Sequence, residues 1–157
     1  MTTIHDAWRS GFVRRWHSNP DMADCGDTNA AHQGRMAVLC IQFFPNHSHE
    51  LLHACVTHDN AEDVTGDIAN PTKQACPEVA DALQAIEDET LKFRGLYVEL
   101  TTEDKYRLKF LDRLDAYKMM VKHNDDLAMR DDWVKAGEWL VTTADKLGVY
   151  SILVNEL

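Results

Sequence analysis

The stretch "SHELLHACVTHDNAE", residues 48–62, has the spacing of one amphipathic helix and contains two overlapping patterns of metal sites. One is the H-E-x-x-H spacing of zinc proteases, and the other is the adjacent pair His58-Asp59, followed by Glu62. At about 100° per residue, the H-E-x-x-H residues share a polar face, whereas His58 and Asp59 fall within the apolar arc. An imidazole and a carboxylate in apolar surroundings need partners. The pair is therefore either an ordinary helix end, with Asp59 accepting backbone hydrogen bonds, or part of a metal site.

The H-E-x-x-H pattern consists of His49, Glu50 and His53. A zinc protease also needs a third protein ligand. The extended form of the motif would need glycine and histidine where this chain has Val56 and Asp59. The pattern is therefore interpreted as a solvated helix face with two histidines. A zinc protease is kept as a remote alternative, and a non-catalytic helical module as another.

Two other predicted helices also turn an ionisable side chain toward apolar neighbours. His32 shares a stripe with Met36, and Asp112 lies in an otherwise apolar line on a later helix, with Asp115 as a weaker candidate one turn on. A buried acid is unfavourable without a partner, whereas a buried histidine is usually satisfied by a hydrogen bond. Together with the His-Asp pair, these residues make a mixed nitrogen and oxygen set. Such a set suits Mn, Co, Fe, Ni, Zn or Mg without selecting one of them.

Apolar periodicity predicts a nearly all-helical chain, with helix boundaries at proline, glycine and capping residues. The predicted helices cover about residues 4–13, 28–44, 48–60, 77–93, 102–123 and 130–147. Residues 62–77 are predicted to form a loop, because Gly66, Pro71 and Pro77 interrupt them. The tail 149–157, "VYSILVNEL", is either a short strand or a packed extension.

Length, charge and cysteine content narrow the class of protein. The 157 residues predict a single domain over 1–157, and the net charge of −10 argues against a general nucleic-acid-binding surface. The four cysteines form no C-x-x-C and suggest neither a zinc ribbon nor a secreted disulfide framework, so a reducing cytoplasm is expected. No apolar signal region and no membrane-spanning run is found.

The order His, His-Asp, Asp on separate helices resembles the HD-domain phosphohydrolases, and most closely their 5′-deoxynucleotidase branch. The matching segments are "RRW" at 14–16, "AHQGRMAV" at 31–38, "HDNAEDVTGDIANPTK" at 58–73 and "FLDRLDAY" at 110–117. The resemblance implies a compact all-α HD-domain bundle of about six helices. It also implies a homo-oligomer, a dimer or larger, to which the apolar tail could contribute.

The resemblance also implies roles for the inward residues. His32, His58, Asp59 and Asp112 would be the ligands of one divalent metal ion, which could be Co, Mn, Zn, Ni or Mg. Glu62 would act as the acid/base or water-orienting carboxylate, and Asp59 would serve catalysis as well as metal binding. Glu62 follows the His-Asp pair by three residues, which is close enough to reach the same water or the leaving group.

Four further residues would contact the substrate according to the same resemblance. Arg15 would bind phosphate, and Trp16 would pack against the sugar and base and favour a deoxyribose. Asp67 would accept a hydrogen bond from the sugar 3′-hydroxyl, and Lys73 would be a second phosphate contact. A guanidinium can bind two phosphate oxygens at once, which suits the role given to Arg15.

The substrate implied by the resemblance depends on the N-terminal segments. "RWHSNP" at 15–20 and "GDTNAAHQGR" at 26–35 look more like phage dATP triphosphohydrolases than like the bacterial monophosphatases. The preferred prediction is therefore a dATP triphosphohydrolase that depletes dATP in the cytoplasm of a phage-infected cell. A 5′-deoxynucleotidase acting on deoxynucleoside monophosphates is the close alternative.

Overall fold

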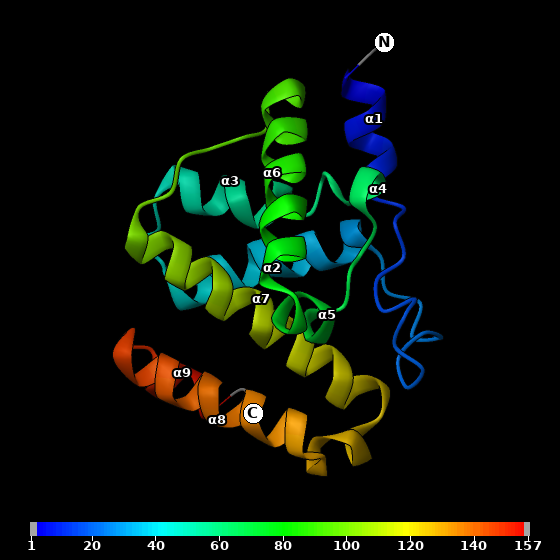
Figure 1. Cartoon of the computed structure of the whole chain (residues 1–157). Helices are drawn as coiled ribbons and strands as arrows, with labels where there is room; N and C mark the ends of the chain where they lie inside the picture. The colour runs from blue at the N-terminus through cyan, green and yellow to red at the C-terminus, as the bar shows by residue number, and fades with distance from the viewer. Residues whose placement is uncertain (1–2, 156–157) are drawn as a thin grey trace. The chain divides into compact units, whose positions relative to one another are not determined.

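Helices make up most of the part of the chain that the structure, a computed structural model, describes, which is residues 3–155. In chain order they are α1 (Thr3–Ser10), α2 (Asn29–Phe43), α3 (His49–Thr57), α4 (Glu62–Thr65), α5 (Asn70–Ala75), α6 (Pro77–Arg94), α7 (Thr102–His123), the 3-10 helix η1 (Asp125–Met129), α8 (Asp131–Lys146) and α9 (Tyr150–Leu153) (Figure 1). Within the described residues the only extended pairing is an isolated bridge between Arg14 and Thr28. The all-α prediction is confirmed, and α1, α2, α3, α6, α7 and α8 correspond to the six predicted helices.

The chain divides into two compact units that alternate along the sequence. The first unit holds the residues up to Gly34 together with Val56–Glu99, and the second holds Arg35–Cys55 together with the residues from Leu100 on. The boundaries therefore fall inside α2, inside α3 and between α6 and α7. The single domain over residues 1–157 stays a prediction, and each unit is described by itself.

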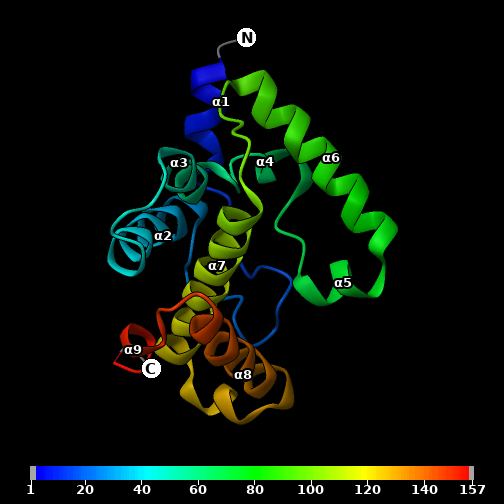
Figure 2. The same ribbon diagram turned by 90° about the vertical axis from the view of Figure 1, so that its left-hand side faces the viewer.

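The core of the second unit is built on α7. The Thr101 side chain caps this helix by accepting a hydrogen bond from the Asp104 backbone N–H at 3.1 Å. α8 and η1 pack against α7, as Figure 2 shows for α7 and α8. The buried core residues are Met36, Cys40, Phe43, Phe44, Leu51, Cys55, Phe110, Leu111, Leu114, Leu140, Ala144, Val149 and Leu153. Phe110 makes edge contacts with Phe43 and Phe44, at ring-centroid distances of 5.6 and 6.4 Å, and so joins α7 to the end of α2.

The C-terminal tail is a packed helix, and the predicted alternative of a strand is wrong. Residues Tyr150–Leu153 form α9, which contacts α8. Leu153 is fully buried in the core, so this part of the tail already has an apolar partner within its own unit. The last two residues of the predicted tail segment lie outside the described residues.

The first unit is organised by α6, which contacts α1, α4 and α5 (Figure 1). Pro77 lies in the first turn of α6, where its missing N–H has no helical partner to lose, and Gly95 ends the helix with φ 68°. The predicted loop over residues 62–77 is wrong in part, because it contains α4 and α5. Their four and six residues are too few to give a detectable apolar period.

The His-Asp pair lies in a turn rather than on a helix. α3 ends at Thr57, three residues earlier than the predicted end at Asn60. The turn is closed by hydrogen bonds from the Asn60 backbone N–H to Thr57 O at 2.9 Å and from the Glu62 N–H to Asp59 O at 3.1 Å. This turn, and not a helical face, orients His58 and Asp59.

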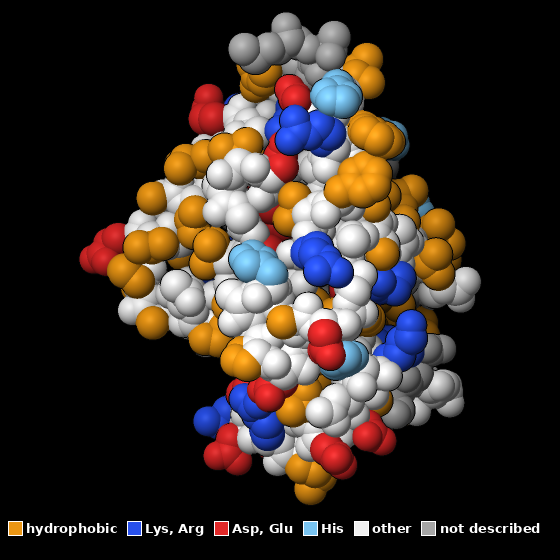
Figure 3. Space-filling view, turned by 90° about the vertical axis from the view of Figure 1, so that its right-hand side faces the viewer, with side chains coloured by type: hydrophobic (Ala, Val, Ile, Leu, Met, Phe, Trp, Pro, Cys, Tyr) orange, Lys and Arg blue, Asp and Glu red, His pale blue; other side chains and the backbone are white. Residues whose placement is uncertain are grey.

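The distribution of basic side chains on the surface agrees with the net charge of −10. On the face drawn in Figure 3, the described Lys and Arg side chains stand among acidic and apolar ones instead of forming one cationic surface. Among residues 3–155, no helix is both long and apolar enough to cross a membrane.

Candidate active site

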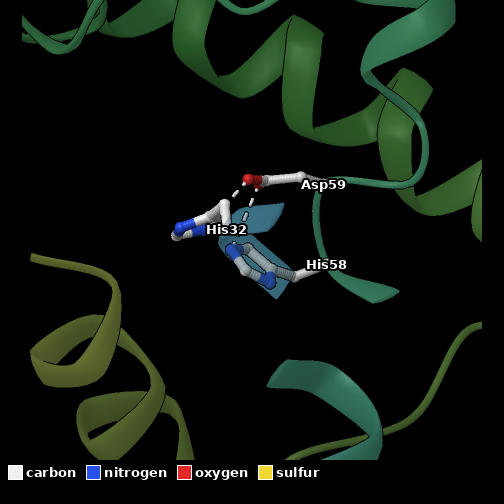
Figure 4. Close-up of side chains that lie close together, drawn as sticks. All are labelled: His32, His58 and Asp59. Carbon is white, nitrogen blue, oxygen red and sulfur yellow. Dashed lines mark ion pairs between the residues drawn. The ribbon is translucent and has the colours of Figure 1, made fainter. Parts of the chain in front are cut away.

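Three predicted metal ligands come together in the first unit. Asp59 points toward two imidazole rings, with Oδ2 at 3.4 Å from His32 Nε2 and Oδ1 at 3.2 Å from His58 Nε2 (Figure 4). The ring centroids of His32 and His58 are 5.4 Å apart. His32 comes from the first turns of α2 and is fully buried, whereas the side chains of His58 and Asp59 are 20% and 15% exposed. The group thus has a buried base and a side that solvent reaches.

The donor atoms of this group fit a divalent metal ion. Each of the three residues can offer one ligand atom, and these atoms all lie within 4.8 Å of one another. Two imidazole nitrogens and one carboxylate oxygen form a borderline donor set that accepts Zn, Co, Ni, Mn or Fe. No other group of three or more His, Cys, Asp or Glu within the described residues has such spacing. A group that could bind a metal is therefore present.

Arg15 reaches the same carboxylate. Its Nη1 donates a hydrogen bond to Asp59 Oδ2, the oxygen that also faces His32. Asp27 also pairs with Arg15: its Oδ2 lies 3.7 Å from Arg15 Nε, and its carbonyl accepts the Arg15 backbone N–H at 3.1 Å. A guanidinium held in this way beside the possible metal ligands can bind an anionic group there.

Trp16 has a strained backbone that is fixed by Asp67. Its φ is 65°, and it is the one non-glycine residue with a positive φ among the described residues. The Trp16 backbone N–H donates a hydrogen bond to Asp67 Oδ2 at 2.7 Å. In this structure, the carboxylate predicted to bind a sugar hydroxyl therefore also holds the turn that carries Trp16. Left-handed backbone costs a side-chain-bearing residue roughly 1–2 kcal/mol, so the surrounding contacts must stabilise it.

This strain gives a testable difference between two variants at position 16. We expect Trp16→Gly to be more stable than Trp16→Ala by about 1 kcal/mol, because glycine takes a positive φ without steric conflict. Both variants lose the indole ring, so their difference in urea unfolding free energy isolates the backbone contribution. An alanine variant as stable as the glycine variant would show that the backbone relaxes when the ring is removed.

Glu62 is buried next to the three-residue group. It begins α4 and is 6% exposed. Burial and, to a smaller extent, the nearby charges of Asp59 and Asp67 raise the pKa of Glu62 to about 9, although Arg15 and a hydrogen bond from Asn29 act in the opposite direction. A carboxyl with a pKa displaced in this way is typical of groups that exchange a proton during catalysis.

Asn29 is a residue of the site that the sequence did not identify. It is fully buried, and its Nδ2 donates hydrogen bonds to Glu62 Oε2 at 3.0 Å and to the Asp59 carbonyl at 3.1 Å. A signal was available in the sequence, since Asn29, His32 and Met36 follow the i, i+3, i+7 spacing of one helix face. A polar amide on that buried face needs a partner.

The other predicted ligand, Asp112, lies in the second unit. It is on α7 and half-buried, and its part in a metal site stays a prediction. The weaker candidate Asp115 is buried on the same helix and forms a bidentate pair with Arg35, with Nε–Oδ1 at 2.7 Å and Nη2–Oδ2 at 2.9 Å. This pair accounts for the burial of Asp115 without a metal.

Lys73, predicted as a second phosphate contact, is half-buried on α5. Its charge acts on Glu87 of α6. Burial raises the pKa of Glu87, and a Thr65 hydrogen bond and the Lys73 charge lower it in part. The binding roles of Lys73, Arg15, Trp16 and Asp67 stay predictions.

The H-E-x-x-H residues lie on α3 and face each other. The rings of His49 and His53 have centroids 6.1 Å apart, and His49 and Glu50 are exposed. Within residues 3–155, no acidic, histidine or cysteine side chain completes a three-residue group with them. The third ligand that a zinc protease needs is therefore missing from the described part of the chain.

A known protein family matches most of the chain. Residues 41–157 match the family of YfbR-like proteins, described as 5′-deoxynucleotidase YfbR-like. The matched range includes the His-Asp pair and Glu62 and begins after His32. The searches of curated proteins and of solved structures found no match.

Proposed function

Because this chain belongs to the YfbR-like 5′-deoxynucleotidase family, whose members are HD-type phosphohydrolases, we propose that it removes phosphate from deoxynucleotides with the help of one divalent metal ion. The observation that carries this proposal is the group of His32, His58 and Asp59, with Arg15 bonded to the same carboxylate. This group brings two imidazoles, a carboxylate and a guanidinium together, which supports a metal site beside an anion-binding group, as the hydrolysis of a phosphate ester requires.

Each residue of the site has its own proposed role in the reaction. His32, His58 and Asp59, with Asp112 as a proposed fourth ligand, would hold the metal. A divalent ion in such a site supplies water activation and neutralisation of phosphoryl charge. Arg15 binds a phosphoryl oxygen from the side of Asp59. Glu62 takes a proton from the attacking water or gives a proton to the leaving oxygen. Trp16 and Asp67 contact the deoxynucleoside, and Lys73 contacts phosphate.

Two substrates are supported by different parts of the chain. The family match over residues 41–157 favours deoxynucleoside monophosphates. The segments at 15–20 and 26–35, which resemble dATP triphosphohydrolases, lie outside the matched range and include Arg15, Asn29 and His32. We therefore keep dATP as the second candidate substrate, with depletion of dATP during phage infection as its purpose.

Product analysis separates the two candidates. The purified protein is incubated with dATP, dAMP, ATP or AMP in the presence of Mn or Co, and the products are resolved by ion-exchange chromatography. Release of deoxyadenosine from dAMP identifies the monophosphatase. Release of deoxyadenosine with triphosphate, or stepwise loss of phosphates from dATP, identifies a triphosphate substrate. Equal rates with ATP and dATP would contradict the proposed preference for deoxyribose.

The H-E-x-x-H residues provide a negative test. We expect the double variant His49→Ala/His53→Ala to hydrolyse deoxynucleotides within about two-fold of the parent, because neither ring contributes to the three-residue group. His58→Ala in parallel should lose nearly all activity. The reverse result, with activity lost at His49 and His53 and kept at His58, would support the protease-type site.

Two further properties are proposed with the function. A homo-oligomer is consistent with exposed apolar side chains on and just after α1, where Trp8 and Phe12 are each 64% exposed. A cytoplasmic location is expected for an enzyme that acts on free nucleotides. Neither nucleic acid nor a membrane is a proposed partner.

A further inference from the structure

Among the described residues, the hydrogen bond to the side-chain carboxyl of Glu62 comes from a buried side chain. Glu62 is held at Oε2 by Asn29 Nδ2 at 3.0 Å, in a contact between two buried side chains. A carboxylate that exchanges a proton must keep one oxygen directed at the reacting group, and free rotation about its side-chain bonds would move that oxygen by more than 1 Å. An error of about 1 Å in the position of a reacting group can lower the rate roughly 100-fold.

Asn29 fixes the turn as well as the side chain. An asparagine amide has two N–H donors, and both are used here: one on Glu62 and the other on the Asp59 carbonyl at 3.1 Å. The Asn29 backbone N–H in turn donates to Val13 O at 3.0 Å, just before Arg15. One residue thus connects the predicted acid/base, the backbone of a metal ligand and the segment that carries the phosphate-binding arginine.

We propose that Asn29 is a positioning residue for the hydrolytic reaction, which fixes the carboxyl of Glu62 relative to Asp59. This inference rests on the proposed function, because it assigns Asn29 an effect through Glu62. It does not require Asn29 to contact the substrate or the metal. Its effect is therefore on the turnover of bound substrate and not on binding.

The kinetic test is a double-mutant cycle. Asn29→Leu, which keeps the branching at Cγ and removes both donors, is expected to lower kcat about 10- to 100-fold and to change KM by less than about three-fold. In a Glu62→Gln background, the same change should lower the residual kcat by less than about three-fold, because the group through which it acts is already gone. Equal losses in both backgrounds, or an effect on KM alone, would overturn the proposal.

Additional variants separate positioning from folding. Asn29→Asp keeps the shape of the side chain but loses the donors, and Asn29→Ala serves if the leucine does not fit; both should lower kcat at least as much as expected for the leucine variant. Ser10→Ala is the matched control, since Ser10 is also fully buried in the first unit but its hydroxyl bonds Ala7 O at 2.8 Å. Its kcat should stay within two-fold in both backgrounds. Thermal unfolding identifies any variant that has lost its fold.

A structural readout keeps this inference distinct from the proposed function. A crystal structure of Asn29→Leu should show the Glu62 side chain displaced from its parent position. A parent that hydrolyses no deoxynucleotide would contradict the proposed function and leave this displacement as the test of the contact. An active parent with unmoved Glu62 and an additive cycle would contradict the role of Asn29 alone.

Discussion

Replacing Asp59 with alanine is expected to abolish tight metal binding and to lower phosphate release by about 1000-fold. The change removes the carboxylate whose two oxygens face His32 and His58 at 3.4 and 3.2 Å. It also removes the acceptor of the Arg15 hydrogen bond. The charge stabilisation that a catalytic metal supplies is worth several kcal/mol, and about 1.4 kcal/mol corresponds to a factor of ten in rate.

The measurement has two parts. Metal content after dialysis, or the heat of binding on titration with Mn or Co, reports the site without reference to activity. Phosphate release from dAMP and dATP then reports the reaction. Asp63→Ala is the matched control, because it removes a carboxylate four residues away that pairs with Arg94 instead, at 2.9 Å. Retention of metal and of activity in Asp59→Ala would contradict the assigned site.

Glu62→Gln is expected to lower kcat by about 100- to 10,000-fold while leaving metal binding intact. General acid–base catalysis contributes factors of this size, and glutamine keeps the shape of the side chain but cannot exchange the proton. Glu62 is outside the three-residue metal group, so the metal content should match that of the parent. A full loss of metal would identify Glu62 as a ligand instead.

The same variant should be more stable than the parent at high pH when the metal has been removed by a chelator. Burial raises the folded-state pKa of Glu62 from the ordinary value of 4.5 to about 9. Above about pH 4.5 the unfolded chain releases this proton and the folded protein keeps it, so parent stability falls as the pH rises toward 9. Glutamine has no such proton.

Thermal unfolding at several pH values tests this linkage. The melting temperature of Glu62→Gln should exceed that of the parent at pH 8, and the difference should shrink toward zero near pH 4. Asp63→Asn is the control, because Asp63 is an acid of the same helix that is more exposed than Glu62. A difference that grows toward low pH would mean that the carboxylate is stabilised in the folded protein, contrary to its burial.

The long helices could be predicted because their boundaries have local causes. The proline that opens α6 and the glycine that ends it are visible in the sequence, and the threonine cap of α7 stands directly before its first turn. The short helices α4 and α5 could not be predicted in this way. Each depends on contacts with α6 that lie outside its own four or six residues.

The candidate site could be predicted only where burial leaves a pattern. His32 can be identified as a buried residue because its imidazole falls on a stripe of apolar residues. The contacts of Arg15 with Asp59 and of Asn29 with Glu62 connect residues that are 44 and 33 positions apart. The local periodicity of apolar residues in the sequence does not indicate such pairs. The prediction of a helix over residues 58–60 is wrong, because these residues form a turn that no local apolar period indicates.

The alternation of the two units along the chain has a practical consequence for cutting the protein. A break between Glu99 and Leu100 would leave α7 and α8 on one fragment and the Phe43 and Phe44 partners of Phe110 on the other. Neither fragment would then contain a complete apolar core for the second unit. Two such pieces, produced together, should fold only by binding each other, so that recovered hydrolysis would report their association. The boundary between Glu99 and Leu100 is therefore a suitable place to divide the enzyme into the two halves of a split reporter.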